Sequence, residues 1–285
     1  MHSSILHIPE ILLPDVCARG IKNKVKYVSI KMSIISPIIS GITYVIHNEN
    51  DVIQKKLMSG SQWNEQIVNI IKSYISEKDL SHFLNVGSHI GSVCLPISLH
   101  IDKVTAIEAY PDTYEHLREN IELNNISNVH TVNIAVGNSE EDIYFMSSEK
   151  ICPVENINRL INNTGGMAVF TEDDIKHNIR SAHLTDKKIK NRITKLDNLE
   201  IDNFDILLVD IEGLEYEFLL GAENKIKKYK PIIIVELWDD RKRMNERMVQ
   251  TREEIINYIE SLDYILIKTI GDDFIFEPVV IPEHK

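Results

Sequence analysis

Short apolar runs alternate with amphipathic segments over most of the chain. Runs of four to eight apolar residues are typical of buried strands, and apolar residues that recur every three or four positions are typical of helices. The predicted strands are FLNV (83–86), VTAIE (104–108), VHTVNIAV (129–136), FDILLVD (204–210), PIIIVEL (231–237), YILIK (264–268) and FIFEP (274–278). The predicted helices cover 51–76, a segment from Ile90, 112–124, 214–228 and 252–262. This alternation predicts βαβ units and a parallel sheet.

The last two predicted strands are separated only by TIGDD (269–273). This connection is too short for a helical crossover, so the two strands are expected to pair antiparallel. The expected fold is α/β, a doubly wound, Rossmann-like sheet of seven strands with an antiparallel last strand. Nicotinamide-binding domains differ because all their strands are parallel.

Two regions do not follow this alternation of strands and helices. Residues 24–46 contain β-branched runs interrupted by Pro37 and Gly41, which predicts hairpin-like strands. We therefore expect a β-rich N-terminal extension or cover over 1–60, followed by the main domain over 61–285. The polar interval 147–193 is longer than a typical connection, and both a cover over a site and a surface loop are compatible with it.

Charge and cysteine content narrow the function classes. The chain has 285 residues, and its 43 acidic and 31 basic residues give a net charge of −12, which disfavours nucleic acids and anionic membranes as partners. Its three cysteines form no CxxC pair, so a reducing compartment is expected. No apolar stretch reaches the ~20 residues of a membrane span, and no signal peptide is recognised. We expect a cytoplasmic protein without membrane or nucleic-acid partners, and an oligomer is compatible with the sequence.

A glycine turn and an acid point to a nucleoside. The strand FLNV runs into GSHIG, which places Gly87 and Gly91 where backbone N–H groups and a helix N-terminus face a ligand. Glu108 ends the next strand, 17 residues after Gly91. An acid at this spacing accepts hydrogen bonds from the two ribose hydroxyls of an adenine nucleoside. The ligand is therefore expected to contain adenosine.

Further acids follow two later strands. Asp210 and Glu236 end apolar runs, and a buried carboxylate near another acid is a suitable general base. Glu212 is a third catalytic candidate, although it could also simply favour a helix dipole. His177 and His183 rank behind the acids because a lone loop histidine is more often exposed. HxH, HExxH and DxDxDG motifs are absent, so no metal is expected.

In their order and spacing, these segments resemble the FkbM family of S-adenosylmethionine (SAM)-dependent methyltransferases from about residue 51 to residue 236. The segments that carry the resemblance are DVIQKKLMSGSQWNE (51–65), FLNVGSHIG (83–91), IEAYPDTYEHLRENIELN (107–124), VNIAVGN (132–138), ITKLDNL (193–199), VDIEGLEYEFLLGA (209–222) and KPIIIVE (230–236).

The resemblance implies roles for individual residues. It places Glu108 at the ribose of SAM, Ala135 at the adenine, and Asp210 at the acid of the strand-four motif, whose remaining acids match Glu212 and Glu215. Gly87, Ser88 and Gly91 would line the methionine part. The implied cofactor-binding set is Glu65, Asn85, Gly87, Ser88, His89, Gly91, Glu108, Ala109, Ala135 and Asp210.

This sequence departs from the family pattern at four positions. Asn85 replaces an Asp and loses its charge, His89 stands where Asn is common, and Ala109 stands where Pro is common. Leu208 replaces a Lys that usually lies two residues before the strand-four acid.

The predicted function is SAM-dependent O-methylation of a hydroxyl on a small molecule, sugar or glycan. An RNA-cap 2′-O-methyltransferase is an alternative, which Leu208 and the negative net charge disfavour. A non-catalytic SAM-binding or partner-binding module is a second alternative, suggested by Asn85 and Leu208. A nicotinamide-dependent enzyme is disfavoured because GxGxxG is absent.

Overall fold

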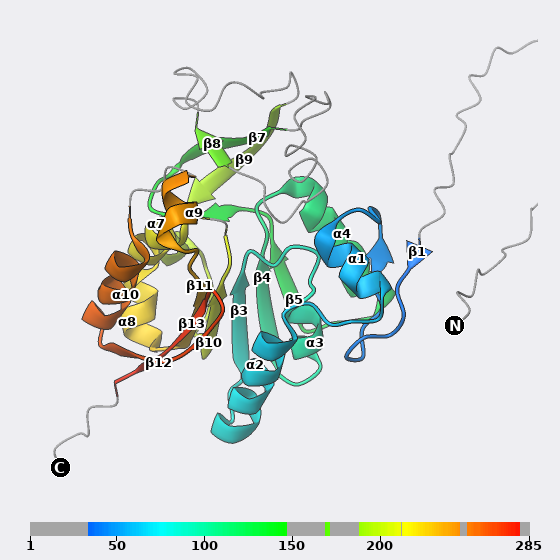
Figure 1. Ribbon diagram of the computed structural model, residues 1–285, viewed down its shortest axis with the longest axis horizontal. Helices are drawn as coiled ribbons and strands as arrows, with labels where there is room; N and C mark the ends of the chain where they lie inside the picture. The colour runs from blue at the N-terminus through cyan, green and yellow to red at the C-terminus, as the bar shows by residue number, and fades with distance from the viewer. Residues whose placement is uncertain (1–33, 147–168, 172–187, 212, 246–249, 280–285) are drawn as a thin grey trace, which may run out of the picture. The chain divides into compact units, whose positions relative to one another are not determined.

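A seven-stranded sheet forms the centre of the computed structural model, which describes residues 34–146, 169–171, 188–211, 213–245 and 250–279 (Figure 1). In sheet order the strands are β12 (Tyr264–Ile270), β13 (Asp273–Pro278), β11 (Ile232–Glu236), β10 (Ile206–Val209), β3 (His82–Val86), β4 (Lys103–Ile107) and β5 (Val129–Val132). All of them are parallel except β13, which is antiparallel to both β11 and β12. The predicted sheet, including its closing hairpin, is confirmed.

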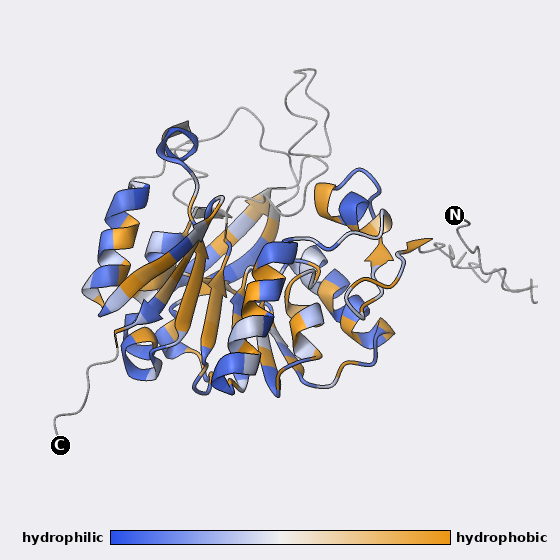
Figure 2. Ribbon diagram, turned by 60° about the horizontal axis from the view of Figure 1, so that its bottom comes forward, coloured by the Kyte–Doolittle hydropathy of each residue, from blue (hydrophilic) through white to orange (hydrophobic). Residues whose placement is uncertain are grey.

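Helices cover both faces of this sheet (Figure 1). They are α1 (Val52–Met58), α2 (Glu65–Lys78), α3 (Cys94–Ser98), α4 (Pro111–Leu123), the 3₁₀ turn η3 (Leu196–Asn198), α7 (Glu215–Gly221), α8 (Glu223–Tyr229), α9 (Asp240–Asn245) and α10 (Arg252–Ser261). Helices α1 to α4 share a buried core with one face, and α7, α8 and α10 share a core with the other. In Figure 2 the central strands are mostly hydrophobic, whereas the helices contain both hydrophilic and hydrophobic residues. Burial on both faces explains why these strands are almost continuously apolar.

Local backbone geometry divides two of the predicted helices. The helix expected over 51–76 is divided into α1 and α2, because Gly60 (φ +81°) and Asn64 (φ +45°) adopt left-handed conformations between them. The helix expected over 214–228 is divided into α7 and α8 at Ala222. The segment from Ile90 becomes helical only at Cys94, where α3 begins.

The predicted strand 129–136 is also divided. Only 129–132 joins the central sheet as β5, whereas β6 (Ala135–Val136) joins a second, four-stranded sheet of order β6-β9-β7-β8. Its other strands are β7 (Glu141–Met146), β8 (Val169–Thr171) and β9 (Lys188–Thr194). Asn133 lies at the point of division, where its side-chain amide donates to the carbonyl of Glu108 at 2.8 Å. The polar interval 147–193 thus contains strands where it is described, while 147–168 and 172–187 lie outside the described residues.

A polar stripe of α4 holds the segment that precedes α1. In this segment β1 (Ile34–Ile35) pairs antiparallel with β2 (Val45–Ile46), which confirms the hairpin predicted within 24–46 for its described part. Asn120 accepts from the Val45 N–H at 2.8 Å, and His116 Nε2 donates to the Val45 carbonyl at 2.8 Å. Asn124 accepts from the Thr43 N–H and donates to the Thr43 carbonyl, at 2.9 and 2.7 Å. Because these three side chains recur every four residues, they lie on one helix face and replace a neighbouring strand as hydrogen-bond partners.

One compact unit extends from Ser33 to Lys285. The boundary expected at residue 60 stays a prediction. Within the described residues, no helix combines the length and the apolar character that crossing a membrane requires.

Candidate active site

A cavity of about 220 Å³ lies where the parallel strands β3, β4 and β10 end. Segments far apart in the sequence contribute to its wall, including the start of α1 and the second sheet. The lining residues are Val52, Ile53, Trp63, Asn64, Val86, Gly87, His89, Ile107, Glu108, Ala109, Tyr110, Ile134, Ala135, Val136, Phe145, Asp210, Ile211, Leu214 and Glu236. Carboxyl ends of parallel strands are where open α/β sheets bind their ligands.

The turn after β3 requires glycine at its first position. Gly87 has φ +81°, and its N–H donates to the Ile107 carbonyl at 2.9 Å. A Cβ atom there would lie 1.8 Å from the backbone oxygen of Asp210, which no real side chain tolerates. The absence of a side chain therefore lets the end of β3 approach the end of β10.

Backbone groups hold the carboxylate of Glu108 at the cavity wall. One of its oxygens accepts from the His89 N–H at 2.8 Å, and the other accepts from the Tyr110 N–H at 2.8 Å. Burial raises the pKa of Glu108 to about 7, although these backbone hydrogen bonds favour the ionised form. Each carboxylate oxygen has a second lone pair, so the side chain can still accept two ligand hydroxyls. The site therefore fits a ribose.

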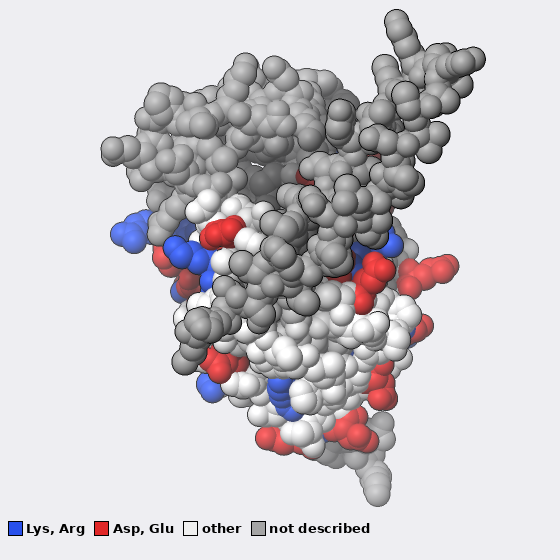
Figure 3. Space-filling model, turned by 90° about the vertical axis from the view of Figure 1, so that its right-hand side faces the viewer, with Lys and Arg blue, Asp and Glu red and all other residues white. Residues whose placement is uncertain are grey.

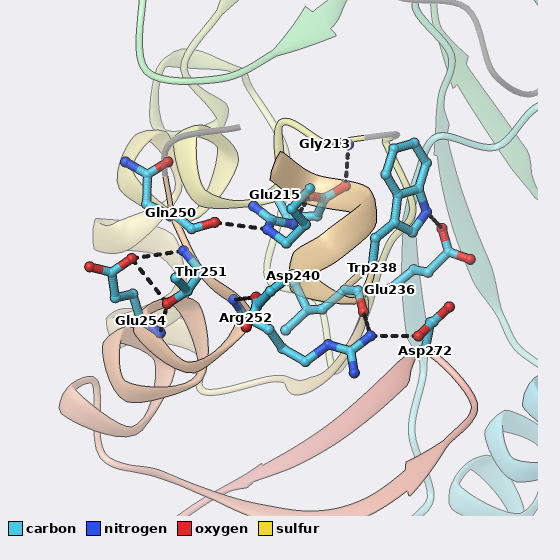
Figure 4. A network of polar contacts seen from close by, with 12 residues as sticks. Gly213, Glu215, Glu236, Trp238, Asp240, Gln250, Thr251, Arg252, Glu254 and Asp272 are labelled. Atoms are coloured by element: carbon cyan, nitrogen blue, oxygen red, sulfur yellow. Dashed lines mark hydrogen bonds and ion pairs between the residues drawn. The ribbon is translucent and has the colours of Figure 1, made fainter. Parts of the chain in front are cut away.

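A second group of acids surrounds the end of β11. The Trp238 indole N–H donates to Glu236 at 3.1 Å, and Glu236 lies directly opposite Asp273 across the β11–β13 ladder. Burial, followed by the charges of Glu236 and Asp272, raises the pKa of Asp273 to about 7. Arg252 contacts Asp272 at 2.5 Å and balances part of this charge (Figure 4).

A buried ion pair supports the loop that follows β10. One oxygen of Glu215 accepts from the Gly213 N–H at 2.7 Å (Figure 4). The other oxygen lies 3.5 Å from the Arg243 guanidinium. The two side chains are only 3% and 2% exposed. Burial raises the pKa of Glu215, while Arg243 opposes this shift. The pair ties α9 to the loop that carries Asp210.

The cavity brings together seven of the residues predicted from the sequence. These are Gly87, His89, Glu108, Ala109, Ala135, Asp210 and Glu236. His89 has φ +49°, and burial lowers the pKa of its imidazole to about 4, so this side chain is neutral at pH 7.

Four predicted cofactor residues do not line the cavity. Glu65 is exposed at the start of α2, and Asn85 is buried within β3. The Ser88 hydroxyl donates to the Asn85 carbonyl at 2.9 Å and so stabilises the glycine turn. Gly91 (φ +89°) faces Leu95, whose Cγ would lie 2.6 Å from an added Cβ. Ser88 and Gly91 thus help to form the turn, but they do not belong to the cavity wall. Glu212, His177 and His183 lie outside the described residues.

Sequence reasoning did not single out the aromatic part of the wall. Trp63, Tyr110 and Phe145 all line the cavity, and the rings of Tyr110 and Phe145 meet edge to face with centroids 5.2 Å apart. Trp63 lies inside the QWNE segment, two positions before the Glu65 that the resemblance selected. Asp273 was also missed, because its position beside Glu236 depends on the order of strands in the sheet.

On the face shown in Figure 3, the Lys and Arg side chains among the described residues do not gather into a basic groove. Acidic and basic side chains are instead scattered among uncharged residues. Leu208, which stands at the position of a family lysine, lies within β10 opposite Asn85 of β3 and is only 4% exposed. No cation therefore arises from this position.

A doubly wound sheet with an antiparallel β13, a glycine turn after β3 and a nucleoside-type acid after β4 define the SAM-dependent methyltransferase class. The family model of the methyltransferase FkbM domain matches residues 85–266, which is more than half of the chain. The protein belongs to this family, as the resemblance implied.

Several solved structures match the chain at low identity and with TM-scores below 0.5. A methyltransferase FkbM from Methylobacillus flagellatus KT is 15% identical with a TM-score of 0.44, and the match covers 79% of this chain and 52% of that one. The chain thus spans about half the length of that relative. An O-methyltransferase from Bacillus cereus, in complex with SAH, is 13% identical with a TM-score of 0.42 over 75% and 80% of the two chains. TYW2 of M. jannaschii, in complex with AdoMet, is 14% identical with a TM-score of 0.39 over 87% of both chains. No curated protein matches the chain.

Proposed function

We propose that this protein is an O-methyltransferase that transfers the methyl group of SAM to a hydroxyl of a small molecule, sugar or glycan. The observation that carries the proposal is one cavity that contains both the backbone-held Glu108 and the carboxylates Asp210 and Glu236. When bound, SAM supplies an electrophilic methyl group. The protein must position the acceptor hydroxyl, remove its proton and exclude water.

Glu108 is the proposed ribose contact, and Gly87 allows the cofactor to approach the backbone of the turn. Ala109 and Ala135 are small enough to leave space for the flat face of an adenine, and both belong to the cavity wall. His89, Asn85, Ser88, Gly91 and Glu65 complete the proposed cofactor set. In this structure Asn85, Ser88, Gly91 and Glu65 would act by shaping the surroundings of the cavity, since they do not line it.

Asp210 and Glu236 are the proposed bases, and Glu212 stays a third candidate. Asp210 directly follows β10 and Glu236 is the last residue of the adjacent parallel strand β11, so both can face a hydroxyl bound at this edge. The indole N–H that donates to Glu236 fixes the orientation of its carboxylate. An oriented carboxylate beside the reacting hydroxyl is the arrangement that general-base catalysis requires.

The aromatic wall supports an acceptor with a flat face, such as a sugar ring or an aromatic alcohol. Trp63 offers its indole from the α1–α2 connection, and the Lys56 ammonium lies 5.5 Å from the centre of that ring. Aromatic side chains suit such acceptors because their faces are broad, rigid and apolar.

The test is to incubate the protein with SAM and a panel of glycosides and aromatic alcohols, and to detect methylated product by mass spectrometry. We expect product with the wild type and a loss of about 10²-fold or more in kcat for Asp210→Asn or Glu236→Gln. The matched control is Asp239→Asn. Asp239 is an exposed acid three residues after Glu236, and it does not line the cavity. SAM binding without product from any acceptor would favour the non-catalytic module instead.

A further inference from the structure

A second cluster of potential ligands lies on α4, next to the segment that precedes α1. His116 and Glu119 are three residues apart and therefore share a face of α4, and His47 follows β2. One ligand atom from each of the three residues lies within 4.8 Å of the other two. Among the described residues, no other group of three or more His, Cys, Asp or Glu side chains has its ligand atoms this close together.

The hydrogen bonds of His116 leave one ring nitrogen as a ligand. Its Nε2 donates to the Val45 carbonyl at 2.8 Å, so this nitrogen carries the proton and Nδ1 carries the lone pair. Histidines that bind metals commonly donate their other N–H to a backbone carbonyl, which fixes the tautomer and the ring orientation. The contact with Val45 therefore prepares His116 for coordination.

His47 and Glu119 complete the set from the solvent side. His47 Nε2 lies 2.6 Å from Glu119 Oε2, and the rings of His47 and His116 lie with their centroids 4.1 Å apart. The side chains of His47 and Glu119 are 39% and 42% exposed, so they can turn toward a shared ion without disturbing the core. Ligands of a tetrahedral zinc ion are about 3.3 Å apart, so His47 and Glu119 would separate by only about 0.7 Å.

We propose that His47, His116 and Glu119 form a site for a divalent transition-metal ion of the Zn²⁺ type. Two imidazoles and one carboxylate suit such an ion, whereas Mg²⁺ and Ca²⁺ prefer oxygen ligands. The fourth position of the ion would be taken by water.

A bound ion would connect α4 to the wall of the cavity. His47 lies four residues before Asp51, whose carboxylate caps α1 by accepting from the N–H groups of Ile53 and Gln54 at 3.0 and 2.9 Å. Val52 and Ile53 line the cavity. The site would therefore brace this segment against the core, and it does not depend on the proposed methyl acceptor.

The test is calorimetric titration of the tag-free full chain with ZnCl₂ at pH 7.5, beside His47→Ala and Glu119→Gln. Both substitutions affect exposed side chains, which keeps the fold intact. We expect one Zn²⁺ per chain, a dissociation constant at least tenfold weaker in each variant, and no binding of Mg²⁺. His100→Ala removes an exposed histidine elsewhere and should bind Zn²⁺ like the wild type.

Titration with Co²⁺ gives an independent readout, since the intensity of its visible absorption reports four-coordinate geometry. We expect this absorption in the wild type and its loss in His47→Ala. Absence of stoichiometric Zn²⁺ binding, or binding that His47→Ala and Glu119→Gln leave unchanged, would overturn the proposal. The three residues would then be an ion pair beside a histidine that only anchors Val45.

Discussion

The pKa of Glu108 makes cofactor affinity depend on pH. Its folded pKa of about 7 lies above the ordinary value of 4.5, so the side chain is protonated below pH 7 and ionised above it. Only the ionised form can accept a hydrogen bond from both ribose hydroxyls while it keeps the His89 and Tyr110 N–H groups satisfied. Affinity for SAM should therefore increase as the pH rises through 7.

The magnitude follows from the ionised fraction. With a pKa of about 7, roughly 9% of Glu108 is ionised at pH 6 and roughly 91% at pH 8, which predicts an affinity about tenfold higher at pH 8. Glu108→Gln cannot ionise, and it loses a hydrogen bond to a charged acceptor worth about 1.5–3 kcal/mol. This variant should bind SAM about 10- to 150-fold more weakly than the wild type at pH 8.

The assay is calorimetric titration at pH 6, 7 and 8 with SAM and with 5′-methylthioadenosine. The second ligand keeps the ribose but lacks the amino acid, so its own groups do not titrate in this range. At pH 7 the wild type should release protons on binding, since part of Glu108 must ionise. Glu122→Gln, an exposed acid on α4, is the control. Equal wild-type affinities at pH 6 and 8, or full affinity in Glu108→Gln, would refute the reasoning.

Three further predictions concern stability. The folded pKa of Asp273 is raised from 3.8 to about 7, so the folded state favours the protonated side chain and the free energy of unfolding falls as the pH rises from about 4 to about 7; Asp273→Asn should therefore raise Tm relative to wild type more at pH 8 than at pH 5, and the reverse order would contradict this. Gly87→Ala should lower the free energy of unfolding by about 3 kcal/mol or more in urea titration, whereas Gly271→Ala, which also has positive φ but no atom within 4 Å of the added Cβ, should cost about 1 kcal/mol. Arg243→Met should cost about 3–5 kcal/mol because it leaves the Glu215 carboxylate buried without its partner, and adding Glu215→Gln should recover part of this loss; equal urea midpoints for the single and double variants would argue against the ion pair.

The sequence by itself determined the features that depend on local pattern. Apolar runs bounded by polar turns predicted the strands of the central sheet, because a strand buried on both faces must be apolar throughout. The five-residue connection after Lys268 predicted the antiparallel closing hairpin. Gly87 and Glu108 were proposed from spacing alone, and both line the cavity, since a strand, a tight turn and a helix leave little freedom in the position of each.

Only the tertiary structure decided which distant residues meet. Strand β13 inserts between β11 and β12, which places Asp273 opposite Glu236, although a hairpin at the sheet edge is equally compatible with the pattern. The Arg243–Glu215 pair joins α9 to the start of α7, two helices that follow different strands. His47 and His116 are 69 positions apart in the sequence, and they meet because α4 binds the backbone of 43–45. Such contacts depend on how whole elements pack, and no periodicity within an element encodes them.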